Sequence, residues 1–413
     1  MNINDFPTYP DTSGSYALNQ VPKFSLETQH KCKVQIKIGI YVLFTGSYRP
    51  DPSSDMIVAD FKDIYKEKVE TLFPSGNVFT QTNHTRWFSA VWTQDNDTVT
   101  IQFVVSNAKL KSDERLYVWA GSHFLTNQPK EKHITKVSPE WLTYMAGSKI
   151  MVKARVYSAS GSYNDYTLSN GGSGAKTVDV SCTRIKQAVG ATAQLKGYYD
   201  ILLVNNGTVM AIQRYIVRRI TGSEHYFVFV NALGGIDTLI CRGDNILQPE
   251  DTFNTGRLAA RRVALDDTDS VRTWQQNLRF NWRERNWIHE LLTEKQQAYI
   301  HHPDSGGFDE IIVTGMDLNV GDREKMATAS FNYMLADADD IPSYTTKETS
   351  DGLKMSSLRH AEDIIIEESE VQDPQEPGED PDPEDPEDPE EPGAGEDPED
   401  PEQNQDPEEE VEP

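Results

Sequence analysis

The residues that could do chemistry in this 413-residue chain are few and scattered. Two imidazoles stand side by side at His301 and His302, and a metal site built on them would need a third and a fourth ligand. The sequence has neither an H-E-x-x-H pattern nor cysteine pairs at a zinc-binding spacing. We interpret the pair as the polar end of a helix that stops before Pro303, and we predict no metal site.

Two acidic clusters, at 266–269 and 337–340, resemble loose calcium-binding loops. Neither has the alternating acidic order, the central glycine and the final glutamate of such a loop, so both are predicted to be solvated turns. The tripeptide at Arg242, Gly243 and Asp244 matches an integrin-binding motif. It directly follows a predicted strand, which favours an ordinary β-turn over a role in adhesion.

A pair of glycines, Gly234 and Gly235, separates two apolar runs at 224–233 and 236–241. The pair lacks the spacing of a phosphate-binding loop and opens no helix. Glycine can adopt positive φ, so we predict a tight connection between two buried strands. The chain also lacks a G-x-S-x-G nucleophile motif. We therefore predict no catalytic, cofactor-binding or metal-binding residues, no cofactor and no enzyme activity.

Three cysteines, Cys32, Cys182 and Cys241, are too scattered for a disulfide framework, and we predict buried free thiols. Glycosylation sequons begin at Asn83, Asn96 and Asn206, but they carry meaning only in an exported protein. The first residues show neither a basic region nor an apolar region typical of a signal peptide, so export is not expected. No apolar run approaches the ~20 residues of a membrane span, and no membrane insertion is expected.

The acidity of the chain is concentrated in its last part. The formal net charge is −27, yet residues 361–413 hold 26 acidic and no basic residues, which leaves 39 basic and 40 acidic residues elsewhere. Frequent prolines and like charges predict a disordered, extended tail over 371–413. Such a tail repels nucleic acid. It is either a solubilising bristle or a docking segment for a basic partner.

Alternating apolar residues dominate the body and predict a mainly β fold of antiparallel sandwich or barrel-like domains, with one or two short helices and the disordered acidic Pro-rich tail. Hairpin turns are predicted at 95–97 and at 205–207. Helices are predicted at 59–73 and 282–300, the second capped by Asn281. Residues 40–44 and 116–119 are predicted as strands, and 158–173 as a long exposed loop.

The predicted domains follow the chain in order. An N-terminal arm (1–30) precedes a β-rich domain with one helix (31–125) and a β-sandwich domain or its continuation (126–190). A C-terminal β domain (191–345) carries the helix at 282–300, and residues 195–241 are predicted to form one antiparallel unit within it. A linker (346–370) leads to the acidic tail (371–413).

Aromatic residues allow a sugar-binding platform. Trp87, Trp92 and Trp287 fall in apolar runs or on the apolar stripe of the predicted helix, and we predict that all three lie in the core. Tyr157, Tyr163 and Tyr166 lie in or beside the predicted loop, and we predict that they form an exposed cluster. This cluster supports an alternative function, a β-sandwich module that binds surface glycans or a host receptor.

Five segments resemble a family of tail-associated virion proteins of bacteriophages and prophages of the Bacteroidetes. They are FLTNQPKE at 124–131, WLTY at 141–144, FVNALGGIDT at 229–238, WIHELL at 287–292 and IIVT at 311–314. The similarity extends from about residue 124 to residue 344, and the acidic tail departs from the family pattern.

The resemblance implies a structural role in a phage tail or baseplate. The expected partners are copies of the same chain and other tail proteins, with a host receptor or glycan as a further possibility. Such a protein is made and assembled in the bacterial cytoplasm and ends in the virion. Symmetric assembly would give the edges of the predicted sheets a use.

Overall fold

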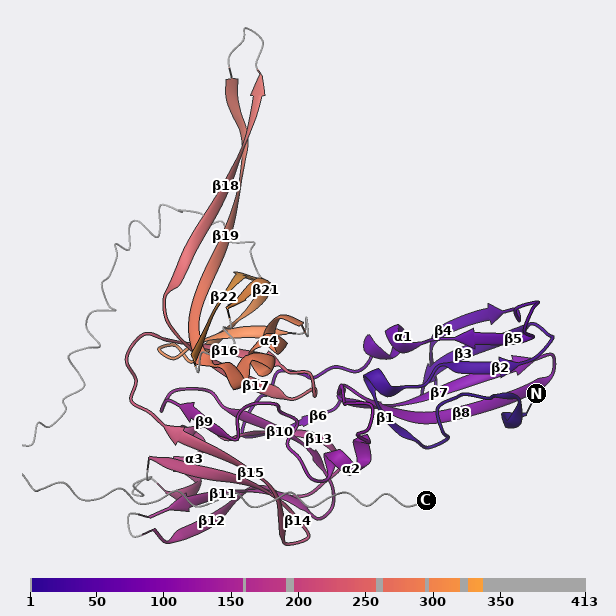
Figure 1. The fold of residues 1–413 in the computed structure, drawn as a ribbon, viewed down its shortest axis with the longest axis horizontal. Helices are drawn as coiled ribbons and strands as arrows, with labels where there is room; N and C mark the ends of the chain where they lie inside the picture. The colour runs from indigo at the N-terminus through magenta and orange to yellow at the C-terminus, as the bar shows by residue number, and fades with distance from the viewer. Residues whose placement is uncertain are drawn as a thin grey trace, which may run out of the picture. The chain divides into compact units, whose positions relative to one another are not determined.

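The protein, seen here as a computed structural model, is described over residues 2–158, 161–190, 197–257, 263–293, 297–319 and 326–336. These residues form a mainly β fold, which confirms the predicted fold class (Figure 1). The described part contains four short α-helices, α1 (Lys62–Lys66), α2 (Leu116–Ala120), α3 (Cys182–Val189) and α4 (Arg285–Thr293). The predicted linker, the acidic tail and the acidic cluster at 337–340 lie outside the described residues.

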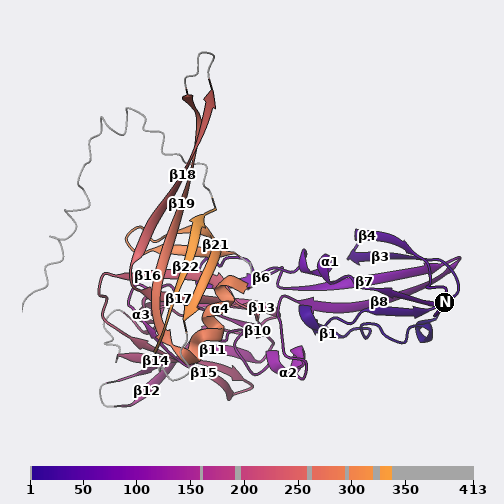
Figure 2. The same ribbon diagram turned by 45° about the horizontal axis from the view of Figure 1, so that its top comes forward.

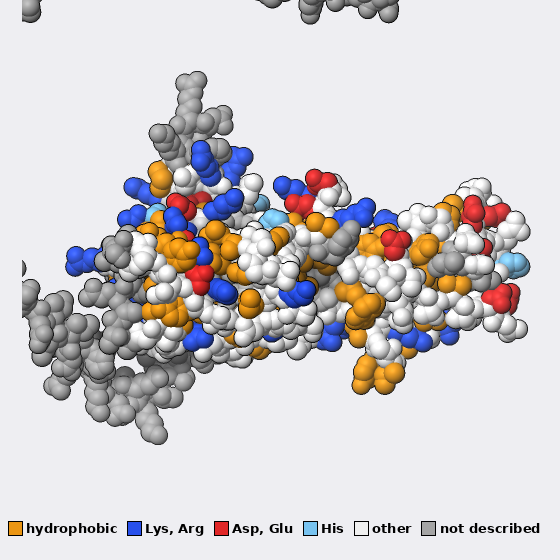
Figure 3. Space-filling model, turned by 90° about the horizontal axis from the view of Figure 1, so that it is seen from below, with side chains coloured by type: hydrophobic (Ala, Val, Ile, Leu, Met, Phe, Trp, Pro, Cys, Tyr) orange, Lys and Arg blue, Asp and Glu red, His pale blue; other side chains and the backbone are white. Residues whose placement is uncertain are grey.

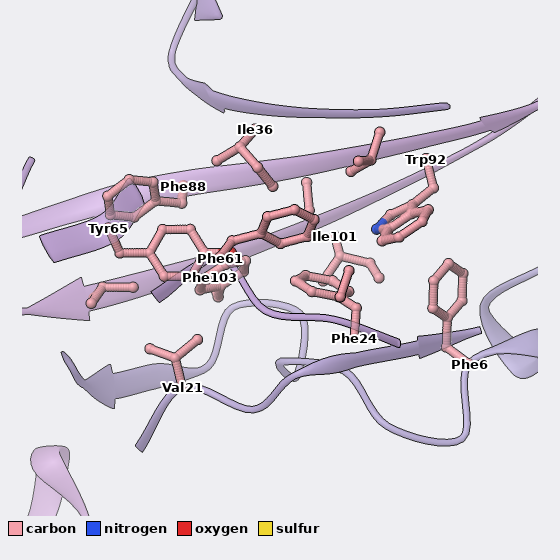
Figure 4. Packing of buried hydrophobic residues seen from close by; sticks show 14 of the residues in the cluster. Phe6, Val21, Phe24, Ile36, Phe61, Tyr65, Phe88, Trp92, Ile101 and Phe103 are labelled. Atoms are coloured by element: carbon pink, nitrogen blue, oxygen red, sulfur yellow. The ribbon is translucent and has the colours of Figure 1, made fainter. Parts of the chain in front are cut away.

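The N-terminal part is built on a five-stranded sheet that faces a two-stranded sheet. The larger sheet has the order β1-β8-β7-β3-β4, and β2 pairs with β5. Aromatic side chains fill the space between them, with Trp92 fully buried and its ring 5.7 Å from those of Phe6 and Phe24 (Figure 4). The strands are β1 (Ser15–Ala17), β2 (Phe24–Glu27), β3 (Cys32–Ile38), β4 (Tyr41–Tyr48), β5 (Met56–Ala59), β7 (Thr85–Gln94) and β8 (Asp97–Ser106).

The prediction of an N-terminal arm over 1–30 is wrong. This segment contains β1 and β2, two 3-10 helices (Ile3–Asp5 and Leu18–Gln20), and the buried residues Phe6, Leu18, Val21, Phe24 and Leu26. Strand β1 pairs in parallel with β8, about ninety residues away in sequence. The local sequence has prolines and isolated apolar residues, so its periodicity is weak, and only the distant partner strands order it.

A second sandwich follows, with its core between a three-stranded and a five-stranded sheet. The orders are β10-β13-β6 and β12-β11-β14-β15-β9, and α3 adds Cys182 and Ile185 to the core. The strands are β6 (Val78–Gln81), β9 (Glu131–Ile134), β10 (Trp141–Ala146), β11 (Ile150–Tyr157), β12 (Tyr163–Ser169), β13 (Gly174–Asp179), β14 (Tyr198–Asn205) and β15 (Thr208–Val217).

This sandwich draws strands from three of the predicted domains. Strand β6 comes from the predicted 31–125 domain and pairs with β13, and β14 pairs with β11. The prediction that 195–241 form one antiparallel unit is therefore wrong, because β14 and β15 belong to one sheet and β16 and β17 to another. Strand pairing over such distances leaves no periodic signal in the sequence.

The third part is a seven-stranded sheet with the order β17-β16-β20-β21-β22-β19-β18. It curls until β17 contacts β19. Trp287, Ile288 and Leu291 of α4 pack into the core of the curl. The strands are β16 (Glu224–Val230), β17 (Ile236–Arg242), β18 (Asn245–Arg257), β19 (Val263–Asn281), β20 (Ala298–His302), β21 (Gly307–Asn319) and β22 (Met326–Leu335).

Strands β18 and β19 form a hairpin that extends beyond this sheet (Figure 2). Strand β22 pairs with β19 only from Trp274 onward, so the preceding residues of β19 pair with β18 alone. The acidic cluster at 266–269 lies in this part of β19, so the predicted solvated turn is wrong there.

Several predicted elements are correct in type. The Gly234-Gly235 break joins the antiparallel strands β16 and β17. Hairpin turns occur where predicted, with Asp95 at φ 51°, Asn206 at φ 50° and Gly207 at φ 84°. The left-handed conformation of these residues is the one that two-residue hairpin turns require.

Other predicted elements are corrected. Residues 116–119 belong to helix α2 rather than to a strand, and 158–173 contain β12 instead of forming one loop. The helix predicted at 59–73 is reduced to α1. The helix predicted at 282–300 begins as a 3-10 turn (Trp282–Glu284), ends at Thr293 and is followed by β20. Short apolar runs fit a helix and a strand equally well, which explains these errors.

Burial also differs from expectation at two places. Residues 40–44 are predicted to be covered on both faces, yet Ile40 is 86% and Tyr41 72% exposed. They stand at the β3–β4 turn, where the chain leaves the core. Trp87 is 57% exposed, while Trp92 and Trp287 are buried as predicted. No helix among the described residues is long and apolar enough to cross a membrane.

Phe6→Ala tests the docking of the N-terminal segment. The ring is 3% exposed and packs edge-on against Trp92, so its loss should lower the free energy of unfolding by about 3 kcal/mol in a denaturant titration. Ile40→Ala, at an exposed position, is the control and should change it by less than about 0.5 kcal/mol. An unchanged midpoint for Phe6→Ala would contradict the docked arrangement.

Candidate functional site

The Gly234-Gly235 loop sits where residues of all three parts of the body meet. Gly234 has φ +72°, and a Cβ on it would lie 1.7 Å from the Asn107 carbonyl oxygen. A Cβ on Gly235 would lie 1.9 Å from the Leu125 carbonyl oxygen. Real atoms never approach so closely, so any side chain at either position would push the backbones apart. Gly234 is needed both for its conformation and for this contact, and Gly235 for the contact alone.

Asn231 holds this loop in shape. It is fully buried, its Nδ2 donates to the Leu125 carbonyl at 2.9 Å, and its Oδ1 accepts from the backbone amides of Leu233 and Gly235, each at 2.9 Å. One side chain thus satisfies three backbone groups that burial would otherwise leave unpaired, which is worth more inside a protein than at its surface.

Residues of the N-terminal part bind the same loop. The Thr71 hydroxyl donates to the Gly234 carbonyl at 2.6 Å, and the Lys109 amide donates to the Ala232 carbonyl at 2.8 Å. From α4, a carboxylate oxygen of Glu290 accepts from the Ala232 amide at 3.0 Å, and the other accepts from Asn127 at 2.8 Å. The loop therefore joins the parts of the body through hydrogen bonds, and Leu233 adds buried apolar contacts in a cluster with Leu110 and Leu125.

His84 lies against this loop and is fully buried. Its Nδ1 is 3.1 Å from the Ser106 hydroxyl, and its Nε2 makes no hydrogen bond within the described residues. Burial lowers the pKa of His84 to about 4, against a smaller opposing effect of the Leu233 and Gly234 backbone. The imidazole is thus neutral at physiological pH.

A buried ion pair lies next to the loop. Lys132 Nζ is 2.6 Å from a Glu140 carboxylate oxygen and 5.5 Å from the centre of the Trp287 ring. Burial raises the pKa of Glu140 to about 7, and Lys132 opposes the shift. Nearby Asp237 is fully buried and accepts from the Thr126 hydroxyl at 2.7 Å and from Trp287 Nε1 at 2.8 Å, and burial raises its pKa too. One Glu140 oxygen is paired with Lys132 and both Asp237 oxygens accept hydrogen bonds, whereas the second Glu140 oxygen makes none within the described residues.

The two histidines weighed as metal ligands in the sequence, His301 and His302, are not brought together with further ligands among the described residues. His301 and His302 lie in β20 rather than at a helix end, which corrects that interpretation. His301 Nδ1 is 3.0 Å from the Gly307 carbonyl, and His302 Nε2 is 2.8 Å from an Asp309 carboxylate. Within the described ranges, no group of three or more His, Cys, Asp or Glu side chains is placed to hold a metal ion.

The remaining motifs have structural explanations. Arg242 ends β17 and lies 3.6 Å from the Glu224 carboxylate, with Gly243 and Asp244 in the bend that follows. Cys32, Cys182 and Cys241 are buried and unpaired, which confirms the prediction of free core thiols.

The outer face of the second sandwich carries a ladder of opposite charges that periodicity could not reveal. Five directly paired residues cross the five strands in the order Asp165, Arg155, Asp200, Arg214 and Glu131. Arg155 binds Asp165 through two bonds of 2.8 and 2.9 Å, and Arg214 binds Asp200 through two of 2.7 and 3.0 Å. Bidentate geometry fixes the orientation of each guanidinium on this face of the sheet.

A row of tyrosines lies beside this ladder. The rings of Tyr163 and Tyr198 lie 6.1 and 4.9 Å from that of Tyr157, whose hydroxyl donates to Asp200 at 2.7 Å. The Arg155 guanidinium covers the ring of Tyr163 at 4.0 Å. Tyr166 pairs with Ala154 and packs against the core, so the predicted cluster of Tyr157, Tyr163 and Tyr166 is wrong in its third member. Tyr198 takes its place, from a strand remote in sequence.

No protein-family model matches this chain, and no curated protein matches it. What the protein does must therefore be inferred from its own residues. Among the described residues, the polar groups around the loop are buried and most of them are hydrogen-bonded, while aromatic, apolar and charged groups lie on the surface.

Gly234→Ala should prevent stable folding. The added methyl group would lie 1.7 Å from a backbone oxygen, and the loss of soluble, cooperatively unfolding protein in a urea titration would show it. Gly39→Ala is the matched control, because Gly39 also has positive φ (+55°) but open space around it. It should cost only about 1–2 kcal/mol. Equal effects of the two substitutions would contradict the close approach.

His84 should make stability sensitive to acid. Its pKa is about 4 when folded and about 6.5 when unfolded, so below pH 6.5 the unfolded chain binds a proton that the folded chain cannot. Relative to wild type, His84→Gln should therefore gain about 2 kcal/mol in free energy of unfolding between pH 7 and pH 5. Exposed His30→Gln is the control and should show no such gain.

The Glu140 carboxyl changes the pH dependence of stability in the direction opposite to His84. With a folded pKa of about 7, it holds a proton in the folded chain that the unfolded chain has lost, so its contribution weakens as the pH rises from about 4.5 to 7. To separate the contribution of His84, the free energy of unfolding of His84→Gln is compared with that of wild type at each pH. A difference that stays constant from pH 7 to pH 5 would contradict the neutral buried imidazole.

Proposed function

We propose that this chain is a structural subunit of a bacteriophage or prophage virion, in a tail or baseplate, and that it works through contacts with its own copies and with neighbouring tail proteins. The observation that carries the proposal is the β18–β19 hairpin, which extends from the curled sheet. A long two-stranded arm has little independent stability in water, and contact with another subunit would stabilise it.

The base of this hairpin offers an open edge. Among the described strands, β18 pairs with β19 alone, and Ile246 and Leu247 near its start are 44% and 46% exposed. An unpaired strand with exposed apolar side chains favours pairing with another chain. Pro249 lies in the same strand and cannot donate to a ladder, which limits indiscriminate pairing.

The rest of the surface is compatible with specific assembly. On the face in Figure 3, hydrophobic side chains form several separate patches among polar and basic ones. Outside residues 361–413 the chain has nearly equal numbers of basic and acidic residues, so repulsion between the bodies of two subunits is small.

A role in binding glycans or a host receptor is the alternative, and the tyrosine row favours it. Tyr163 is 53% exposed and stands with Tyr157 and Tyr198 on one sheet face. Tyrosine and arginine are also the residues that dominate protein interfaces, so the row fits subunit contacts equally well.

Leu247→Lys tests the structural proposal. Wild-type protein should form oligomers or rings in light scattering and negative-stain images. The substitution should weaken self-association about tenfold or more, because it places a charge in the contact. Val58→Lys, at a position 60% exposed on β5, is the matched control and should associate like wild type. A particle that stays monomeric at high concentration would overturn the proposal.

A further inference from the structure

A cavity of about 840 Å³ opens between the N-terminal segment and the loop that precedes α2. Its volume falls in the range of about 300–1,000 Å³ that is typical of small-molecule sites. None of the sequence motifs lies in this cavity, and the proposed assembly does not involve it. Its lining is Asp11, Ser13, Gly14, Ser15, Tyr16, Asn19, Gln20, Ser112, Glu114, Arg115 and Leu116.

Two amide side chains fix one wall of the cavity. The Asn19 side chain makes two hydrogen bonds with the Leu110 backbone: it donates to the carbonyl at 2.7 Å and accepts from the amide at 3.0 Å. Gln20 Nε2 donates to the carbonyls of Lys111 and Glu114 at 2.6 and 2.7 Å. The loop at 110–114 is thus held in place without any ligand, and the wall is preformed.

The opposite wall is a tight turn around Tyr16. The Asp11 amide donates to the Tyr16 hydroxyl at 2.7 Å. Ser13 has φ 65°, a conformation that a serine rarely adopts. A Cβ on Gly14 would lie 2.8 Å from the Tyr16 ring, so the turn closes directly over the aromatic side chain. A non-glycine residue held at positive φ beside a cavity is a frequent mark of a functional site.

The lining excludes several classes of ligand. Tyr16 and Leu116 supply its large apolar side chains, which is too little for a lipid or a steroid. Two carboxylates, Asp11 and Glu114, face one guanidinium, Arg115, so a phosphate or another anion would be repelled. Among the described residues no metal-binding group of three occurs, so a metal ion has no ligand set here.

The groups that remain match sugar hydroxyls. The lining combines three serine hydroxyls with two carboxylates, which accept hydrogen bonds, and an aromatic ring, against which the apolar face of a sugar can pack. We propose that this cavity binds a neutral saccharide of a bacterial surface polysaccharide. This goes beyond the proposed structural role, since it gives the subunit a ligand outside the particle.

The test uses the full-length protein on an array of neutral, acidic and amine-bearing bacterial oligosaccharides, followed by calorimetric titration of the best neutral binder. Wild type should bind a neutral saccharide. Ser112→Trp, which fills the cavity from an exposed loop position, should abolish binding. Ser75→Trp is the control, at an exposed serine outside the lining, and should bind like wild type.

Glu114→Gln refines the test. It keeps an oxygen that can accept from the Lys111 amide, as Glu114 does at 3.3 Å, but removes the charge that strengthens bonds from sugar hydroxyls, so affinity should fall about tenfold. An oligolysine peptide serves as the cationic competitor.

Three results would overturn the saccharide site: no neutral saccharide bound, undiminished binding by Ser112→Trp, or binding of the peptide alone. Light scattering on the same samples reports assembly, and none of these variants changes β18. Failure of the saccharide site is therefore distinguishable from failure of the structural proposal.

Discussion

The body of this protein depends on the close approach of backbones at the Gly234-Gly235 loop. Contacts of this kind are possible only without side chains, because a single methyl group would collide with the carbonyl of Asn107 or Leu125. The approach also buries polar backbone groups, and Asn231 and Thr71 satisfy them. Conformation, packing and hydrogen bonding therefore constrain the same few residues, and none of the three can change alone.

Around this loop the protein keeps ionisable groups in the dry interior. His84 stays neutral, while Glu140 is balanced by Lys132 and Asp237 by hydrogen-bond donors. Their contributions to stability change with pH in opposite directions, which moderates the net dependence between about pH 4.5 and 6.5. Removing one member would cost more than the pair contributes, since the other would remain buried and unpaired.

The surface of the protein carries a different set of side chains from those at this centre. The hairpin edge at Ile246 and Leu247, the tyrosine row and the polar cavity beside Tyr16 each present side chains to the surface. They lie on different parts of the chain, so the proposed assembly and the proposed ligand binding can be tested separately. A body with buried hydrogen bonds and distinct surface features fits the proposed role of a subunit that contacts several neighbours.

The sequence by itself determined the mainly β fold, the hairpin turns at Asp95 and Asn206, the strand–Gly-Gly–strand unit and the buried cysteines. Each of these follows from a local pattern, namely alternation, a turn dipeptide or an apolar surrounding. Only the tertiary structure decided that residues 6–27 join a core, that β6 crosses into the second sandwich and that Tyr198 replaces Tyr166 beside Tyr157. It also brought Asp11 and Glu114 to one cavity. The physical reason is that strands pair, and cavity walls meet, across long stretches of chain, and such contacts leave no period in the sequence.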